Sequence, residues 1–411
     1  MTTEPRPTSF LVQNARLVFP DRIEPKGDLR VVDGKIASVA PALSPEPGET
    51  VLDAAGRYLA PGFIDIHLHG ALGRDAMEAT PEAFETICRF HASGGTTALA
   101  LATITAPTDA IVNVLRTAQA YRQTPHAGAQ LLGIHVEGPY FSPQKPGAHR
   151  LELIRNPTPA DYEPLLPFGE GDGRVMLQMT LAPELPGALE LIDRLRRRGV
   201  RVSGGHSDAW DEEACAAFTH GMEGATHTFN CMSGARRRGP YRVAGLLEYV
   251  LSEPGIVCEL IADGHHVAPT LMRMLRAAKG QDGVILVTDA SAGAGLEKGK
   301  PFLLGDVECV AGEGICLTAD GTALAGSAAT MAGLVRTMVA EVDVPLAEAI
   351  RMATLNPARA LRLDHRKGVL TRGTDADLVL LDEALQVERT WVAGRLEYQR
   401  GSVSAGKEVS S

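Results

Sequence analysis

The strongest constraint on the fold is a repeat that runs through the chain after Gly62, in which short apolar stretches alternate with longer amphipathic ones. The short stretches predict buried strands, and the longer ones predict helices that cover them. The predicted strands are Phe63–His69, Thr97–Ile104, Leu131–Glu137, Val175–Leu181, Val200–Gly204, Gly224–Phe229, Val257–Ala262 and Val284–Asp289, with helices expected at 81–93, 108–122, 185–198, 211–220 and 270–279. Strand–helix units repeated in this way predict an α/β fold, a (β/α)8 TIM-like barrel with parallel strands.

The two ends of the chain follow a different pattern. They contain short alternating stretches broken by Gly and Pro, which predict strands and hairpins: Phe10–Val18, Asp28–Val39, Val51–Leu59, 368–382 and 387–398. We expect both ends to form one small, discontinuous β-sandwich domain, from residues 1–60 and 365–411, beside a barrel domain of residues 61–364. The polar segment 401–411 is expected to be disordered.

Composition excludes several classes of function. The chain has 411 residues, of which 45% are hydrophobic, so it has enough apolar side chains for a large core. Its net charge of -10 argues against binding to nucleic acid, which needs a broad basic surface. No apolar run is long enough to span a membrane and no signal-peptide pattern opens the chain, so we expect no membrane contact. The six cysteines show no Cys-x-x-Cys spacing and are expected to be free thiols of a cytoplasmic protein.

Two arginine clusters stand out in this acidic chain. The first consists of Arg194, Arg196, Arg197, Arg198 and Arg201. It lies at the end of a predicted helix, where cations interact favourably with the helix dipole, and we interpret it as solvated helix surface. The second cluster, Arg236–Arg238, follows closely on His227 and Asn230, and we interpret it as a candidate site for an anion.

Several predicted strands end on side chains that bind divalent metals. His67 and His69 lie two residues apart on one strand, so both project from the same face with Leu68 opposed. A pair of packed core histidines would show the same spacing, but other strands end on similar side chains: Glu137, His206, His227 and Asp289. In a barrel the carboxyl ends of all strands meet at one face, which carries the active site. Imidazole and carboxylate together therefore predict a metal centre there.

Motifs at the two ends of the barrel region resemble those of the amidohydrolase superfamily. They are Pro61-Gly62-Phe63-Ile64-Asp65-Ile66-His67-Leu68-His69 and Gly373-Thr374-Asp375-Ala376-Asp377-Leu378-Val379. Further motifs, at 135–139, 147–149, 203–206, 227–230, 261–267, 287–290 and 324–327, together resemble the N-acetylglucosamine-6-phosphate deacetylases, and this match spans nearly the whole chain. The resemblance implies hydrolysis of the N-acetyl amide of N-acetylglucosamine-6-phosphate, which yields glucosamine-6-phosphate and acetate.

The resemblance also implies a set of metal ligands. Glu137, His206 and His227 would hold the main ion, while His67 and His69 would hold a second ion that Glu137 bridges. Some members of the family lack the His-x-His pair and use one metal, so one or two ions per subunit are both open. Zinc is the expected ion, and iron, cobalt and manganese suit the same ligands.

Asp289 and His266 are the predicted catalytic residues. A bound divalent metal lowers the pKa of its water from about 15.7 to about 7, and it polarises the carbonyl, which leaves the amine to be protonated. Asp289 ends the last barrel strand and is expected to take a proton from the water and pass it to the amine; its alternative role is a structural cap of a turn. His266 is expected to donate to the carbonyl oxygen or a sugar hydroxyl. The family's pattern selects it over His265.

The predicted substrate contacts are His149, Ala148, Asn230, Cys231, Arg238 and His266. Asn230 and Arg238 would bind the phosphate, because arginine suits bidentate phosphate contact. The sequence departs from the family here, since Cys231 stands where Ala is usual and Arg238-Gly239-Pro240 replaces the usual pattern, so the register of the arginine stays open. His135 shares a strand face with Glu137 and is interpreted as a partner of the metal ligands.

Three alternatives remain open at this stage. The first is a deacetylase of N-acetylgalactosamine-6-phosphate. The second is another amidohydrolase, acting on a cyclic amide or a nucleobase; many of these bridge two metals with a carboxylated lysine on the fourth strand, where this chain has Gln178, Met179 and Thr180. The third is an inactive scaffold, which usually lacks metal ligands. By resemblance the expected partner is a phosphorylated amino sugar, and the expected assembly is a homodimer.

Overall fold

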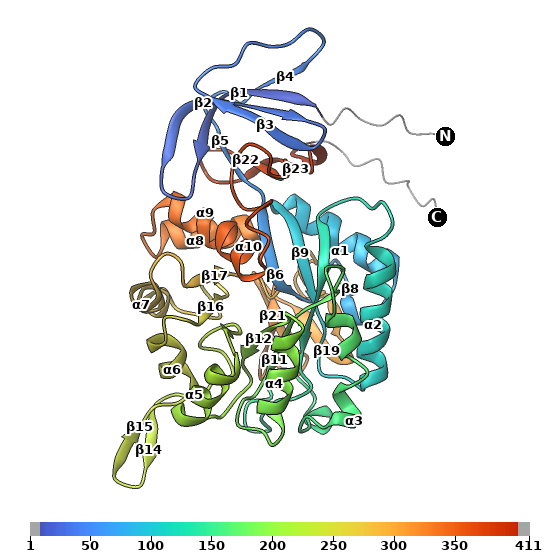
Figure 1. Cartoon of the computed structure of the whole chain (residues 1–411), viewed down its shortest axis with the longest axis vertical. Coiled ribbons are helices and arrows are strands. Elements are labelled where there is room, and N and C mark those ends of the chain that lie inside the picture. The colour runs from blue at the N-terminus through green and yellow to red at the C-terminus, as the bar shows by residue number, and fades with distance from the viewer. Residues whose placement is uncertain (1–8, 402–411) are drawn as a thin grey trace.

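The computed structural model describes residues 9–401, which form a barrel and a smaller sheet domain stacked above it (Figure 1). The segment beyond residue 401, expected to be disordered, lies outside the described residues. Among residues 9–401, no helix has the length and the hydropathy that crossing a membrane requires.

The predicted barrel sheet is confirmed, with parallel strands in the order β17-β16-β13-β12-β11-β10-β9-β6. Its strands are β6 (Phe63–Leu68), β9 (Thr96–Ala102), β10 (Gln130–Glu137), β11 (Met176–Leu181), β12 (Arg201–Gly204), β13 (Gly224–Ala225), β16 (Val257–Leu260) and β17 (Val284–Leu286). β6 and β9 are buried along their whole length, as expected for strands covered on both faces. β13 ends four residues earlier than the predicted Gly224–Phe229, because the chain turns after Ala225.

Hydrogen bonds between the segment after β17 and β6 close the barrel. The Asp289 amide donates to the His67 carbonyl over 2.9 Å, and the His69 amide donates to the Ala290 carbonyl over 2.7 Å. The buried carboxylate of Asp65 accepts from the Thr288 hydroxyl over 2.6 Å. The closure therefore places the residues that follow the last strand directly beside the His-x-His pair.

Helices surround the barrel and bury their apolar faces against it (Figure 1). They are α1 (Pro81–Ser93), α2 (Thr108–Tyr121), α3 (Pro159–Tyr162), α4 (Ala188–Arg197), α5 (Asp211–His220), α6 (Leu246–Ser252), α7 (Pro269–Lys279), α8 (Met331–Ala340), α9 (Leu346–Ala353) and α10 (Leu355–Ala360), with short 3-10 turns at Ala76–Glu78, Leu151–Leu153 and Leu166–Gly169. In α1, for example, the Thr80 side chain accepts from the Ala83 amide and so caps the helix, while Phe84 and Ile87 are fully buried.

Strands from both ends of the chain form a separate sheet domain, as predicted. The sheet order is β24-β23-β22-β5-β1-β2-β3, with β4 beside β1. The strands are β1 (Phe10–Val18), β2 (Ile23–Val32), β3 (Lys35–Ala40), β4 (Thr50–Asp53), β5 (Tyr58–Pro61), β22 (Leu378–Leu381), β23 (Val387–Val392) and β24 (Arg395–Gln399). Phe10 stacks on Trp391 at 5.6 Å although two strands separate β1 from β23, so the sheet folds over a shared core like a sandwich. The division at residues 60 and 365 stays a prediction.

The motif Gly373–Val379 has a structural role at the junction of the two domains. Lys367 is 2% exposed and lies 3.0 Å from Asp375 and 2.5 Å from Asp377. The Asp377 carbonyl in turn accepts from the Gly62 amide over 2.8 Å. The end of the chain therefore holds the link between β5 and β6.

One surface interpretation is wrong. Arg201 does not belong to the helix α4 but lies in β12, where it is 3% exposed and pairs with the buried Glu259 of β16 at 3.3 Å. Strand alternation turns its side chain into the barrel instead of toward solvent. Within the same cluster, Arg197 is 71% exposed, as expected for helix surface.

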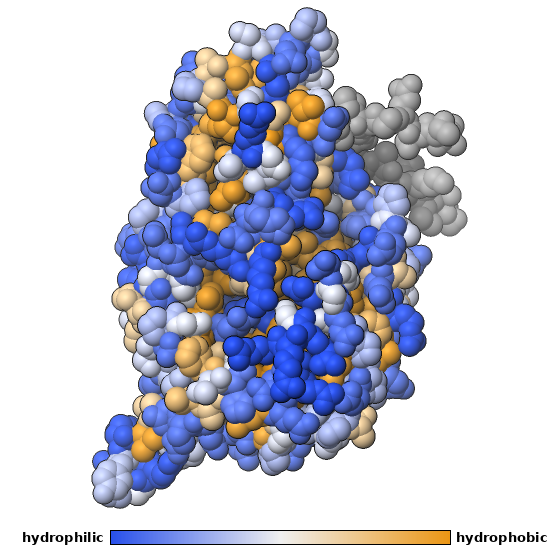
Figure 2. Space-filling view, viewed as in Figure 1, coloured by the Kyte–Doolittle hydropathy of each residue, from blue (hydrophilic) through white to orange (hydrophobic). Residues whose placement is uncertain are grey.

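Three elements were absent from the predicted repeat. A hairpin of β14 (Arg236–Arg238) and β15 (Tyr241–Val243) stands out from the barrel, and Figure 2 shows it projecting from the body with a largely hydrophilic surface. A four-stranded antiparallel sheet follows β17, formed by β18 (Pro301–Leu304), β19 (Val307–Ala311), β20 (Ile315–Thr318) and β21 (Leu324–Ser327). A small hairpin of β7 (Gly70–Ala71) and β8 (Arg74–Asp75) follows β6.

Candidate active site

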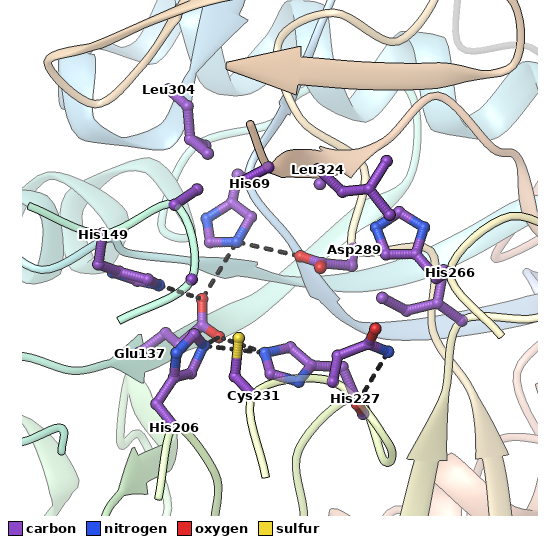
Figure 3. Close-up of a pocket in the computed structure, with 16 residues that line it drawn as sticks. His69, Glu137, His149, His206, His227, Cys231, His266, Asp289, Leu304 and Leu324 are labelled. Carbon is purple, nitrogen blue, oxygen red and sulfur yellow. Dashed lines mark hydrogen bonds and ion pairs between the residues drawn. The ribbon is translucent and has the colours of Figure 1, made fainter. Parts of the chain in front are cut away.

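A cavity of about 240 Å³ opens at the carboxyl ends of the barrel strands, and most of the predicted site residues line it (Figure 3). The predicted residues in its lining are His69, Glu137, Ala148, His149, His206, His227, Asn230, Cys231, His266 and Asp289. A cavity of this volume can hold one small molecule and is too small for a polymer.

Glu137 lies at the centre of four imidazoles. Its Oε2 atom lies 3.3 Å from His67 Nε2 and 3.2 Å from His69 Nε2. Its Oε1 atom lies 3.4 Å from His206 Nε2 and 3.2 Å from His227 Nε2. One carboxylate therefore faces two separate pairs of histidines, each through a different oxygen.

These ligand atoms form two groups that fit divalent ions. In each group, one made of His67, His69 and Glu137 and the other of Glu137, His206 and His227, the ligand atoms lie within 4.8 Å of one another and every residue is buried. His67 Nε2 is buried without a hydrogen-bond partner although it points at Glu137. His206 Nε2 and His227 Nε2 face each other at 3.0 Å. Converging imidazole nitrogens beside a carboxylate form the donor set of a zinc-type site, so the residues fit the predicted ions.

The electrostatics of the cluster keep both carboxylates ionised. Burial alone would raise the pKa of Glu137, but the charge of His67 and the hydrogen bonds from His206 and His227 hold it well below its usual range. Burial likewise acts to raise the pKa of Asp289, and the charge of His67 with the hydrogen bond from His69 lowers it overall. Asp289 Oδ1 lies 3.2 Å from His69 Nε2, so the predicted base is ionised and adjacent to the second group of ligands.

Left-handed backbone turns aim the side chains into the cavity. His206, His227 and Asp289 have φ angles of +48°, +29° and +48°, which non-glycine residues rarely adopt. Each directly follows a barrel strand or its short extension, so the turn bends the chain out of the strand direction. Such strain is typical of functional sites and is maintained by the surrounding structure.

His266 is oriented by Asp263, which the sequence reasoning missed. His266 Nδ1 donates to Asp263 Oδ2 over 2.7 Å, and this leaves Nε2 free to face the cavity. Burial pulls the pKa of His266 down, but the hydrogen bond and charge of Asp263 and the charge of Asp289 outweigh burial and raise it. The spacing of Asp263 and His266, three residues apart after a buried strand, was the available signal.

His149 has the opposite tautomer. Its Nδ1 accepts from the Thr105 amide over 3.1 Å, so the proton of the neutral ring is on Nε2. That atom lies 3.9 Å from Glu137 Oε2, on the cavity side. Burial holds the pKa of His149 well below its ordinary value, and the ring is a neutral hydrogen-bond donor.

A close approach of backbone to side chains shapes the wall beside His149. Gly147 has a φ of +58°, and a Cβ atom there would lie 2.9 Å from Cys231 Sγ. Only glycine fits this position without displacing the thiol. Ala148, Asn230 and Cys231 line the cavity. The side-chain amide of Asn230 donates to the His227 carbonyl over 3.2 Å.

Arg238 is a predicted substrate contact, but it does not line the cavity of its own chain. Its guanidinium pairs with Glu212 at 2.6 Å and lies 4.0 Å from the centre of the Trp210 ring, on the projecting hairpin. The residues that line the cavity include no Lys or Arg. The role of Arg238 in binding phosphate stays a prediction.

Comparison with known proteins identifies the superfamily. The model of the amidohydrolase family matches residues 58–396. The chain belongs to the amidohydrolase family. It is 37% identical over 368 residues to an N-acetylgalactosamine-6-phosphate deacetylase from Escherichia coli O157:H7, covering 90% of this chain and 94% of that one. It is 36% identical to the N-acetylglucosamine-6-phosphate deacetylase of Vibrio furnissii, with 83% of both chains covered.

Solved structures give the same result for the fold. A mutant N-acetyl-D-glucosamine-6-phosphate deacetylase from Mycobacterium smegmatis, in complex with N-acetyl-D-glucosamine-6-phosphate, superposes with a TM-score of 0.86 at 30% identity. The alignment covers 95% of this chain and all of that chain. The family resemblance, the barrel and the enzyme class predicted from the sequence are confirmed.

The additional sheet of this amidohydrolase covers part of the cavity. Leu304 and Leu324, from its first and last strands, lie over the cluster of His and carboxylate side chains in Figure 3. Phe302, Cys309 and Cys316 give the sheet an apolar core of its own. The sequence contained a signal, because Gly305-Asp306 is a two-residue hairpin turn between the paired residues Leu304 and Val307.

Below the candidate metal ligands, the amidohydrolase barrel contains a second polar layer. His135 Nε2 lies 2.7 Å from the Thr180 hydroxyl, and its ring packs edge-on against His67 at 4.4 Å. Burial and the charge of His67 lower the pKa of His135 to about 3, so the ring is neutral. It contacts a metal-ligand candidate without pointing a nitrogen at the cavity centre.

Proposed function

We propose that this amidohydrolase hydrolyses the N-acetyl amide of N-acetylglucosamine-6-phosphate. The observation that carries the proposal is the placement of Asp289 beside a carboxylate that faces four histidines, in a cavity of the size of one small molecule. Two of the compared relatives have this activity in their names, and one was solved with this sugar phosphate bound. N-acetylgalactosamine-6-phosphate is the second candidate, because the relative from Escherichia coli acts on that sugar.

The geometry favours a deacetylase over amidohydrolases that use a carboxylated lysine. The end of the fourth barrel strand offers Thr180, whose hydroxyl is bonded to His135 and Thr226. Glu137 takes the position between the two ligand groups instead.

A divalent metal, when bound, would supply a water of lowered pKa and a Lewis acid for the carbonyl oxygen. Asp289, ionised and at the cavity wall, accepts the proton of the attacking water and returns it to the amine that leaves. His149 and His266 present donors from opposite walls of the cavity, one neutral and one favouring its charged form. They are placed to bind the carbonyl oxygen and a sugar hydroxyl. We assign zinc as the metal, bound by the two groups of ligands that share Glu137.

A phosphate dianion is bound best by lysine or arginine, and the cavity lining has neither. The projecting hairpin carries Arg238 and ends near Tyr241, which is 73% exposed. An exposed aromatic beside arginines is typical of a protein interface. In a homodimer, Arg238 of one subunit would enter the cavity of the partner subunit and bind the phosphate there. We also assign the protein to the cytoplasm, where its six cysteines, all free in the structure, would stay reduced.

Release of acetate tests the assignment. Zinc-loaded protein is expected to turn over N-acetylglucosamine-6-phosphate, to act little on unphosphorylated N-acetylglucosamine, and to lose about 100- to 10,000-fold in kcat in the D289N variant. A faster reaction with N-acetylgalactosamine-6-phosphate would transfer the assignment to that sugar. Metal-loaded protein that releases acetate from neither phosphate would refute a deacetylase.

A further inference from the structure

One metal-ligand candidate is held by a buried carboxylate that the proposed chemistry does not use. His67 Nδ1 lies 3.1 Å from Glu259 Oε2, and both side chains are fully buried. On the other side of the same ring, Nε2 lies 3.3 Å from Glu137 Oε2. The imidazole is therefore held through Nδ1, while Nε2 faces Glu137 without a hydrogen bond.

Glu259 is itself held in place by donors from neighbouring strands. Its Oε1 atom accepts from Gln178 Nε2 over 2.7 Å and from Arg201 Nη1 over 3.3 Å. Arg201 also donates to the Gln178 side chain, and over 2.9 Å to the Ser203 hydroxyl. The charged groups of this layer are paired with each other, and His67 connects Glu259 to Glu137 at the cavity.

We propose that Glu259 is the positioning residue that makes His67 and His69 a second metal site. A carboxylate accepts hydrogen bonds only, so Glu259 keeps a ring proton of His67 on Nδ1, and Nε2 is the nitrogen that would bind a metal. A carboxylate on the far nitrogen also makes the imidazole a stronger donor to a metal. The inference rests on the metal centre of the proposed function, and it is independent of the sugar.

The other ligand group is oriented differently. His206 Nδ1 faces the Lys145 carbonyl at 2.9 Å, so a neutral backbone group sets its tautomer. Among the described residues, His67 is the candidate metal ligand whose tautomer is set by a charged side chain. A change at Glu259 is therefore expected to weaken one ion and leave the other in place.

The role of Arg201 follows from the cost of burying charge. Removing a carboxylate from water is unfavourable unless a buried cation and hydrogen bonds offset the loss of hydration. Apolar residues of similar volume often replace such a pair without loss of stability. Removing both members together is therefore expected to disturb folding less than removing either one alone.

The test measures zinc binding by the purified protein, without an activity assay. Metal-free wild type and the double variant E259L/R201M are titrated with Zn²⁺ against a chromophoric chelator, and bound ions are counted by native mass spectrometry. The matched control is R276M/E348L, which removes an ion pair of 2.7 Å between α7 and α9, outside the barrel. Circular dichroism and the melting temperature verify that all variants fold.

Wild type and control are expected to bind two ions. The double variant is expected to keep the first ion at wild-type affinity and to bind the second about 10- to 100-fold more weakly. Unchanged binding of the second ion, or equal loss of both ions, would overturn the proposal, and so would a wild type that binds one ion. A wild type that binds none would contradict the proposed function itself.

A conservative variant covers the case in which the double variant does not fold. E259Q keeps a side-chain oxygen that accepts the Nδ1 proton of His67, whereas E259A removes this acceptor. The E259Q variant is therefore expected to bind the second ion more tightly than the E259A variant. Equal affinities of E259Q and E259A for the second ion would overturn the role of the hydrogen bond.

Discussion

Replacing Arg238 by Ala should separate binding of the phosphate from the chemistry. The cavity lining contains no lysine or arginine, and Arg238 lies on a hairpin that projects away from the body of its own subunit. Glu212 and Trp210 hold the guanidinium in place before any ligand arrives, so little side-chain entropy is lost on binding.

The expected loss follows from the strength of one charge-assisted contact. A hydrogen bond to a charged group contributes about 1.5–3 kcal/mol, which corresponds to a fall of about 10- to 150-fold in kcat/KM. The loss should appear with the sugar phosphate and not with the unphosphorylated sugar. Arg237 is the matched control, because strand alternation places it on the opposite face of β14 from Arg236 and Arg238.

Mixed dimers test whether the arginine acts across subunits. R238A and D289N chains, co-expressed with different tags, would give mixed dimers in which one cavity combines an intact Asp289 with an intact Arg238 from the partner chain. With random pairing about half of the dimers are mixed, and each has one complete site, so about a quarter of wild-type activity should return. Activity equal to the mean of the two parent variants would refute an arginine supplied by the partner subunit.

Further measurements address the site and the fold separately. D263N should move the alkaline limb of the pH–rate profile to lower pH. Asp263 raises the pKa of His266, so without its carboxylate the ring loses its proton at lower pH. An unmoved limb would exclude charged His266 from catalysis. K367M should lower the free energy of unfolding by about 3–5 kcal/mol, since it removes the lysine that pairs with the buried Asp377, whereas Asp375 keeps Lys35 and Arg366. K298M, at a residue 73% exposed, should change it little, and calorimetry measures both variants. Chelation should abolish acetate release and added Zn²⁺ should restore it, and activity that survives complete removal of metal would contradict the proposed chemistry.

The barrel and most cavity residues were predictable because their signals are local. Alternation of apolar stretches marks each strand, and ligands such as His67 and Glu137 lie at strand ends, where the fold brings them together. The small domain was predictable for the same reason, although the pairing of its two halves depends on contacts between distant segments.

Side chains inside the barrel were harder to predict. The predicted strand Val200–Gly204 already includes Arg201, but its charge favoured grouping it with the nearby surface arginines, because its buried partner Glu259 lies on another strand. Glu259 occurs in an otherwise apolar strand, but its partner is on another strand, so charge compensation is visible only in three dimensions. The sheet of residues 301–327 interrupts the strand–helix repeat, and a rule built on that repeat passes over it.

The junction between β5 and β6 also bears on the order in which the protein assembles. Gly62 alone separates the small domain's strand from the strand that carries His67, and β5 is flanked by β22 from the far end of the chain. On the ribosome, β6 emerges long before β22 and the segment after β17, which support β5 and the other side of β6, have been synthesised. Completion of the metal centre is therefore expected to be a late event in folding, one that waits for long-range pairing and is slow for that reason.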